Sequence, residues 1–474
     1  MKTKKNILLP IYIALWLIFS ISILFYHKNM IFPSFCADGQ TRAVLGAKWI
    51  HAPFLMNEPY SHNSIWLPLQ YWIIGLGLKI FYDLYWVPVA INLLFSAGSL
   101  WFLYKISWMF YENRVVSFIS VLLAGSIPWF IWLSISGMSE PMAIFFIITS
   151  VFFYFNWLKD INRIQYLILS SFMQLLGNMA RYDNLSFSFC LTIAAIAIIL
   201  RNRKLFRARK IAMFFVLICP WVFPLAWHIA QHYNGHTLFA AYYACKKEAD
   251  FFNYLNLKGR VLKFINLGAV SPAIMLLALA ELFRVIHKKT YIHIAYYGVV
   301  MFYSVSLFIL FLGNAIPLIS ERANVISFLL LSPFAARFIY DIFNWFQASF
   351  FLRSLAIVIF SFFIAYNAYL AYSYPLDSWV NTFGPIGQKL KMLWQEGVLN
   401  ENDQVLIKPK DGHEILSYNV TAAYSNHPFN IYVSGIQNPR AAVIHSRFCK
   451  DFADKHTQGK EIYRWADYSV ILLK

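Results

Sequence analysis

The sequence predicts an all-α polytopic membrane protein, and two observations predict this class. Of its 474 residues, 59% are apolar and only 13% are charged, whereas a soluble domain carries roughly a quarter charged residues. Apolar runs also recur along the chain at about the 20-residue length that spans a bilayer core. This composition argues against a soluble enzyme, a nucleic-acid-binding module or a disordered chain, and we expect no nucleic-acid partner. The net charge of +18 is interpreted as loop charge that sets orientation in the membrane.

Each apolar run is interpreted as a helix because lipid offers no partner to free backbone groups. The runs are 7–26, 65–82, 86–105, 115–139, 140–158, 164–180, 184–200, 211–231, 263–284, 290–312, 323–344 and 353–374. The first is expected to be a retained anchor rather than a signal peptide, because it is long and lacks a small-x-small cleavage site.

Orientation follows from lysine and arginine in the short loops. Lys2, Lys4 and Lys5 place the N-terminus in the cytoplasm, and the basic segments 159–163, 201–210 and 287–289 should lie there too. These loops agree with the N-terminus if proline breaks run 115–139 at Pro128. The run would then form two short helices, 115–127 and 128–139, that enter the membrane and return. This interpretation gives about 13 transmembrane helices, two of them short, with the C-terminus outside.

The chain after about residue 374 is not membrane-like. Residues 387–398 are an amphipathic helix candidate, and 404–407, 430–433, 441–444 and 468–473 are short strand-like runs. We therefore expect a transmembrane domain over 1–374 and a small extracytoplasmic α/β domain over 375–474. A long outer loop, 27–64, should lie between the first two membrane helices.

Polar residues distant in sequence converge on the outer ends of the predicted helices, and ionisable groups at such positions usually face a cavity. They are Asp38 in the first outer loop, Glu140 in Ser136-Gly-Met-Ser-Glu-Pro141, Arg181 and Asp183 in Arg181-Tyr-Asp183, and Arg322. Structural roles remain open for all of them. Asp38 and Glu140 could cap helices, Arg181 and Asp183 could pair with each other, and Arg322 could anchor a helix at the interface.

These residues and motifs resemble the GT-C superfamily of membrane glycosyltransferases. The chain is most similar to the family of the protein O-mannosyltransferases and the bacterial aminoarabinose and mannose transferases. Ser64-Ile-Trp-Leu-Pro-Leu-Gln-Tyr-Trp-Ile-Ile-Gly75, the Ser-Glu-Pro and Arg-Tyr-Asp elements, the late outer arginine and the closing outer domain match the family in order. Two departures stand out. Asp38 is followed by Gly39 where many relatives carry a second acid, and Asp183 is shorter than the usual glutamate.

The resemblance implies a polyprenyl-phosphate sugar as donor and transfer on the non-cytoplasmic face of the cell (inner) membrane. The chemistry needs a carboxylate near the acceptor hydroxyl, for which we choose Asp38, with Glu140 as the second catalytic acid. It also needs cations on the departing phosphate, for which the candidates are Arg181, Arg322 and Arg42, with Lys48 in reserve. Substrate-binding candidates are Asp183, Tyr60, His62 and Glu58. With one base and no covalent intermediate the transfer would be inverting.

Several alternatives stay open at this point. Tyr60 and His62 could simply pack in the loop, and a divalent metal held by Asp38 and Glu140 could share the phosphate charge. The sequence does not decide the metal, the sugar or the acceptor, which could be a glycan, a lipid or a protein. Rival functions are a lipid-linked sugar transporter or flippase, a non-catalytic glycan assembly protein, and a ligase that transfers whole glycans. A transporter usually carries paired repeats, and no internal repeat is visible.

Overall fold

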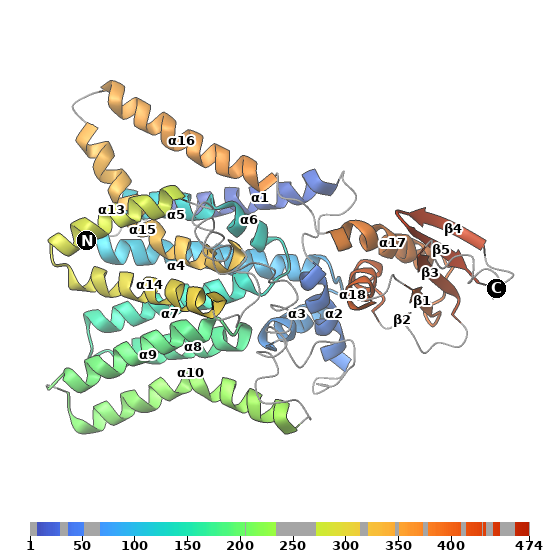
Figure 1. Cartoon of the computed structure of the whole chain (residues 1–474), viewed down its shortest axis with the longest axis horizontal. Helices are drawn as coiled ribbons and strands as arrows, with labels where there is room; N and C mark the ends of the chain where they lie inside the picture. The colour runs from blue at the N-terminus through green and yellow to red at the C-terminus, as the bar shows by residue number, and fades with distance from the viewer. Residues whose placement is uncertain are drawn as a thin grey trace.

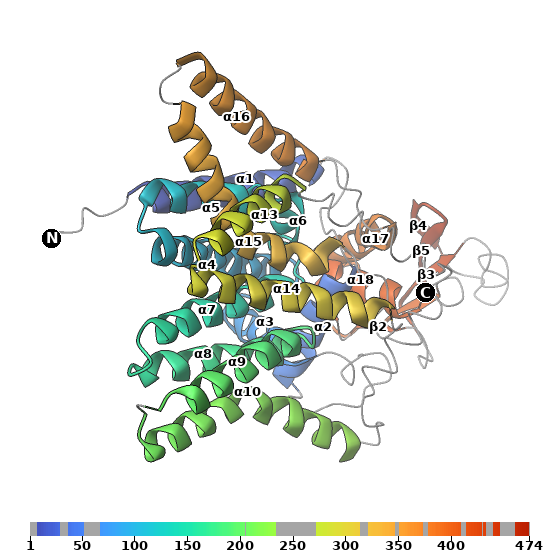
Figure 2. The ribbon, with the colours of Figure 1, turned by 60° about the vertical axis from the view of Figure 1, so that its left-hand side comes forward.

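The computed structural model describes residues 7–28, 37–51, 67–203, 205–233, 272–312, 321–346, 350–372, 378–408, 414–428, 430–432, 439–445 and 460–473. Within these segments the chain forms a helical bundle and a small domain built around a β-sheet (Figure 1). The sheet domain lies beyond one end of the bundle in both views (Figure 1, Figure 2).

The bundle is made of apolar helices of different lengths. They are α1 (Leu8–Lys28), α4 (Trp86–Tyr111), α5 (Arg114–Gly125), α6 (Pro128–Ser134), α7 (Glu140–Lys159), α8 (Ile164–Ala180), α9 (Asn184–Arg201), α10 (Arg207–Tyr233), α13 (Pro272–His287), α14 (Tyr291–Leu312), α15 (Glu321–Trp345) and α16 (Phe350–Tyr372). Eight of the described helices are long and apolar enough to cross a bilayer: α1, α4, α7, α9, α10, α14, α15 and α16. The apolar windows of α7 and α15 are 72% buried, whereas that of α16 is only 11% buried. A buried centre surrounded by exposed apolar helices is the arrangement expected of a membrane bundle.

The predicted break at Pro128 is confirmed, because α5 and α6 are bent by 72° and Pro128 begins α6. The path of this segment nevertheless differs from the expected entry and return. Lys159 Nζ donates to the carbonyl of Met109 at 2.6 Å, so α4 ends beside the basic segment 159–163. Helices α5 and α6 then lead back to the opposite end, where α7 begins. Together they form one broken span, which makes nine candidate spans in the described part of the chain and does not establish the expected 13.

Helix α3 (Leu69–Ile80) covers most of the expected span 65–82. Its 12 residues extend about 18 Å, which is too short for a bilayer core of about 30 Å. Near its start, Gln70 donates to the carbonyl of Gly137 at 2.8 Å. Beyond its end, the carbonyl of Tyr82 accepts from Asn426 of the sheet domain at 3.3 Å. Both ends of α3 therefore lie at the domain end of the bundle. The expected span 65–82 is not a crossing, and the expected loop 27–64 contains a helix, α2 (Ala37–His51).

The C-terminal domain has a five-stranded sheet flanked by two helices. Its elements are α17 (Ser378–Gln395), β1 (Val405–Lys408), α18 (Glu414–Ser425), β2 (Ile431–Tyr432), β3 (Ala441–His445), β4 (Lys460–Trp465) and β5 (Tyr468–Leu472). The strand order is β2-β1-β3-β5-β4. Strand β1 pairs in parallel with β2 and β3, and β5 pairs antiparallel with β3 and β4. The four strand-like runs in the sequence are thus strands, while α18 and the edge strand β4 were not expected.

One hydrophobic core joins this domain to the membrane bundle. Buried residues of α2 and α3, such as Ala43 and Ile74, belong to the same apolar cluster as Phe383 of α17 and Val420 of α18. Burial of this shared surface removes apolar area from water on both partners. Helix α2 is therefore held between α3 and α18, which fixes the helix that carries Asp38.

Candidate active site

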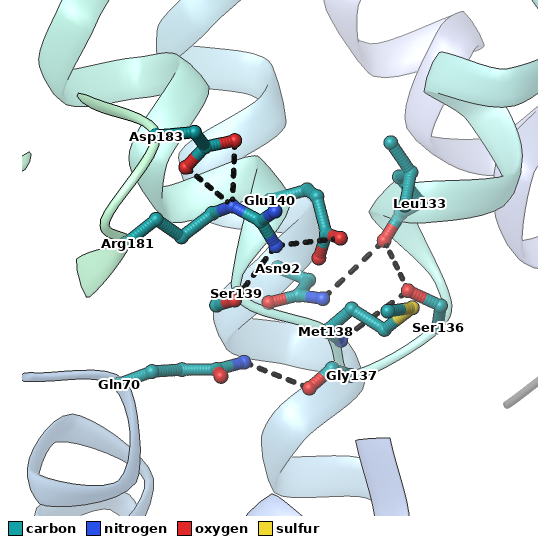
Figure 3. A network of polar contacts seen from close by, with 10 residues as sticks. All are labelled: Gln70, Asn92, Leu133, Ser136, Gly137, Met138, Ser139, Glu140, Arg181 and Asp183. Atoms are coloured by element: carbon teal, nitrogen blue, oxygen red, sulfur yellow. Dashed lines mark hydrogen bonds and ion pairs between the residues drawn. The ribbon is translucent and has the colours of Figure 1, made fainter. Parts of the chain in front are cut away.

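The turn that precedes α7 is held by side chains from several elements (Figure 3). Gln70 donates to the carbonyl of Gly137 at 2.8 Å, and Asn92 donates to the carbonyl of Leu133 at 3.3 Å. The Ser136 hydroxyl donates to the same Leu133 carbonyl at 2.8 Å. Gly137 has a φ of +72°, a conformation that glycine adopts without steric cost. These bonds fix where α7 starts and therefore where its first side chain lies.

That first side chain, Glu140, belongs to a buried ion cluster (Figure 3). Arg181 Nη1 lies 2.7 Å from Glu140 Oε1. Arg181 Nε donates to both oxygens of Asp183, at 2.9 and 3.1 Å. Only 4% of the Glu140 side chain is exposed, against 23% for Arg181. Arg181 and Asp183 therefore do pair with each other, an alternative that the sequence left open. Glu140 joins this pair from a helix distant in sequence.

The charges of this cluster do not cancel. Burial lowers the pKa of Arg181, but Asp183 and Glu140 raise it, and the net shift is upward, so the guanidinium keeps its charge. One cation and two carboxylates leave one net negative charge. Within the cluster, Arg181 contacts Asp183 through Nε and Glu140 through Nη1. A bound phosphate would therefore need cations in addition to Arg181.

Tyr303 of α14 adds a residue that sequence reasoning missed. Its fully buried side chain lies within electrostatic range of Asp183, Arg181 and Glu140. Its ring also packs on Phe187, with ring centroids 4.4 Å apart. A tyrosine within a long apolar helix gives no signal in the sequence that separates it from ordinary core.

Asp38 lies in the first turn of α2, where an acid is favoured by the helix dipole. The next residue, Gly39, packs directly against the turn before α7. A Cβ built on Gly39 would lie 2.2 Å from the carbonyl oxygen of Ser136, a separation that no real side chain tolerates. This contact brings the start of α2 to the turn that carries Glu140. It also explains one departure from the family pattern, because a second acid cannot occupy position 39.

Arg42 follows Asp38 by four residues, so both share one face of α2. It is 9% exposed and interacts electrostatically with Tyr71 of α3. Tyr71 in turn interacts with Tyr182, the central residue of the Arg-Tyr-Asp corner. Arg42 is thus a buried cation on the α2 face that carries Asp38. The reserve cation Lys48 lies farther along α2 and is half-buried.

Arg322 belongs to the first turn of α15, and the structure describes its backbone only. In the second turn of α15, the Ser327 hydroxyl lies 2.9 Å from that of Ser304, which follows Tyr303. The start of α15 therefore lies at the same end of the bundle as the ion cluster. Glu58, Tyr60 and His62 lie outside the described residues.

Among the residues described, no three histidine, cysteine, aspartate or glutamate side chains are grouped to hold a metal ion. Glu140, one of the two expected ligands, already binds Arg181. The described residues thus form no ready-made metal centre, and the divalent ion that the sequence left open stays undecided.

Solved structures resemble this chain over nearly its whole length. ArnT from Cupriavidus metallidurans, in the apo state and bound to undecaprenyl phosphate, matches with a TM-score of 0.62 and 10% identity over 97% of both chains. This chain has the GT-C fold. The archaeal oligosaccharyltransferase AglB from Archaeoglobus fulgidus also matches, in complex with an inhibitory peptide and a dolichol-phosphate. Its TM-score is 0.55 and its identity 13%, over 99% of this chain and 74% of that one.

A second AglB structure, a complex with Zn and sulfate, matches with a TM-score of 0.53 and 14% identity, over 92% of this chain and 68% of that one. No protein-family model matches the sequence, and no curated protein matches it. The GT-C fold expected from the resemblance is therefore confirmed by structural similarity, at identities too low for sequence comparison to carry it.

Proposed function

We propose that this protein is an integral membrane glycosyltransferase that moves a sugar from a polyprenyl-phosphate donor to an acceptor hydroxyl. One observation supports the proposal: Gly39 packs on Ser136, so the start of α2, which carries Asp38, lies against the turn that leads into Glu140. Acid and cation then meet at one end of a GT-C bundle. The lipid phosphates bound to ArnT and AglB support a lipid-phosphate donor.

The site faces the extracytoplasmic side in this proposal. Arg209 Nη1 donates to Asn162 Oδ1 at 3.4 Å, so the basic segments 159–163 and 201–210 lie together. Both lie at the end of the bundle opposite the sheet domain (Figure 2). Clustered basic loops mark the cytoplasmic end of membrane bundles. The site and the domain over 375–474 are then outside, the transmembrane domain covers 1–374, and a lipid carrier has to supply the sugar.

Asp38 acts as the base in this mechanism. Its carboxylate accepts the proton of the acceptor hydroxyl while the oxygen attacks the anomeric carbon. The bond from that carbon to the phosphate oxygen breaks, and the polyprenyl phosphate leaves with the bonding electron pair. A single displacement inverts the anomeric configuration. Asp38 then releases its proton to water.

Arg42 and Arg322 supply the main attraction for the departing phosphate. They are needed because the Glu140–Arg181–Asp183 cluster is net negative and would repel an anion on its own. Arg181 contributes a third contact, since its fork-shaped guanidinium can bind a phosphate while it holds carboxylates. Glu140 is assigned as a positioning residue for Arg181, and Asp183 as its partner on the substrate side, with Glu58, Tyr60 and His62 as further substrate contacts.

The deciding experiment is mass spectrometry of cell-envelope glycans with and without the protein, combined with transfer by the purified protein. We expect one glycan, lipid or protein acceptor to lose a single sugar in cells that lack the protein. The purified wild-type protein should restore it from a polyprenyl-phosphate sugar, and D38N should not. Loss of a whole oligosaccharide would identify a ligase instead. Donor movement across vesicles with no product would identify a transporter.

A further inference from the structure

A cavity of about 180 Å³ lies at the junction of the bundle and the sheet domain, and the proposed reaction does not use it. Its walls come from the outer end of α1, the segment that leads into α4, and helices α17 and α18. The lining residues are Leu24, Phe25, Asp83, Tyr85, Trp86, Gln388, Lys391, Ala423, Tyr424 and Asn426. None of them belongs to the ion cluster or to the predicted site.

One wall is a continuous row of aromatic rings. Phe25 packs on Trp86 with centroids 6.3 Å apart, Trp86 on Tyr85 at 5.0 Å, and Tyr85 on Tyr424 at 5.9 Å. Tyrosine and tryptophan favour the boundary between membrane and water, because their rings are apolar and their tips polar. The row therefore suits a ligand that is itself partly apolar and partly polar.

Hydrogen bonds hold this wall in place. Asp83 Oδ1 accepts from the backbone N–H of Tyr85 at 2.9 Å and of Trp86 at 2.8 Å, which caps the start of α4. Asn426 Oδ1 accepts from the backbone N–H of Leu84 at 3.2 Å, which ties the segment to the sheet domain. Asp83 Oδ1 and the side-chain oxygen of Asn426 are thus engaged, and these bonds form the cavity in advance of any ligand.

The wall formed by α17 carries the other polar side chains that line the cavity. Gln388 and Lys391 are half-buried on α17, three residues apart and so on one helix face. Neither side chain has a hydrogen bond or an ion pair within the described residues. Lys391 therefore offers an ammonium group, and Gln388 an amide, to whatever occupies the cavity.

An exposed apolar stripe on α1 leads to the cavity. Ile11, Leu15, Ile18 and Phe25 lie on one face of the helix, and each is at least half exposed. In a membrane this stripe contacts lipid chains along most of the length of α1. A lipid chain on the stripe would bring its head group to Phe25, at the mouth of the cavity.

We propose that this cavity binds the head group of an anionic phospholipid. The phosphate contacts Lys391 and Gln388, the glycerol part lies on the aromatic row, and one acyl chain follows the α1 stripe. An ammonium group and a side-chain amide are both donors from which a phosphate accepts hydrogen bonds. Because its walls come from both parts of the chain, the bound lipid would also join the sheet domain to the bundle. The proposal does not depend on the transfer reaction.

The test is native mass spectrometry of the full-length protein released from nanodiscs of phosphatidylglycerol or phosphatidylcholine. The wild-type protein should retain phosphatidylglycerol, and K391Q should retain about tenfold less, the effect of one charge-assisted hydrogen bond. K389Q is the matched control, since Lys389 lies on the same helix and does not line the cavity. Equal losses in K391Q and K389Q, or equal retention of both lipids by the wild type, would overturn the proposal.

A second arm separates the two sources of a lipid phosphate. Undecaprenyl phosphate should bind K391Q and the wild-type protein alike, because its proposed site is elsewhere. If K391Q loses undecaprenyl phosphate and keeps phosphatidylglycerol, the cavity is part of the donor site and the proposal is wrong. Thermal unfolding of both variants checks that neither substitution disrupts the fold.

Discussion

Substitution of Gly39 by alanine tests the contact on which the active-site proposal rests. The new Cβ would lie 2.2 Å from the Ser136 carbonyl oxygen, and real Cβ atoms essentially never approach within 3.0 Å. The clash is with backbone, so no side chain can rotate away. The start of α2 must therefore move by roughly 1 Å, and a displacement of that size at a reacting group costs about 100-fold in rate.

The assay is single-turnover sugar transfer by purified G39A with a saturating lipid donor. We expect a fall in the transfer rate of about 100-fold, with a small drop in the melting temperature. G298A is the matched control, because a Cβ at Gly298 meets nothing within 4 Å, and it should transfer at the wild-type rate. A wild-type rate in folded G39A would refute the reasoning, since Asp38 could then move without consequence.

Four further predictions follow from the same geometry. D38N should abolish transfer with an unchanged melting temperature, and normal transfer would exclude Asp38 as the base. E140A should lower the free energy of unfolding by about 1.5–3 kcal/mol, because Arg181 loses its contact with Glu140 while Asp183 still pairs with it; calorimetry showing no change would contradict the pairing. R322A should raise the KM for the donor far more than that for the acceptor, and equal effects would remove Arg322 from the phosphate site. Burial lowers the pKa of His427 below its ordinary 6.5, so the folded state binds fewer protons than the unfolded state. Stability of the sheet domain should then fall as the pH drops below 6.5, and H427F, which keeps the stacking on Trp394, should lose part of that dependence in pH-dependent thermal unfolding.

Much of the site could be placed on one face from the sequence, because its acids and cations stand at helix ends. The Ser-Glu-Pro and Arg-Tyr-Asp elements led to Glu140, Arg181 and Asp183, and the structure joins all three. Tyr303 could not be found in this way, because burial in an apolar helix is the ordinary fate of a tyrosine. The negative balance of the cluster could not be seen either, since it depends on which charges are within contact distance.

Hydropathy predicted most of the helices but not their paths. Run 65–82 is apolar because α3 packs between α2, the bundle and the sheet domain, and burial in protein selects the same residues as burial in lipid. Run 115–139 crosses once with a bend at Pro128, whereas the sequence favoured entry and return. Both differences have one cause. The length and periodicity of an apolar run indicate that its residues are buried, but they do not distinguish burial in protein from burial in lipid.

The sequence by itself determined the class of protein, the break at Pro128 and the identity of the polar candidates. These properties are local, because residue composition and spacing set helix length, helix ends and loop charge. Only the tertiary structure decided that α2 is a helix clamped by α18, that Gly39 rests on Ser136, and that Arg181 is shared by two acids. Each of these is a contact between segments distant along the chain, and its geometry exists only once the helices and the sheet domain pack together.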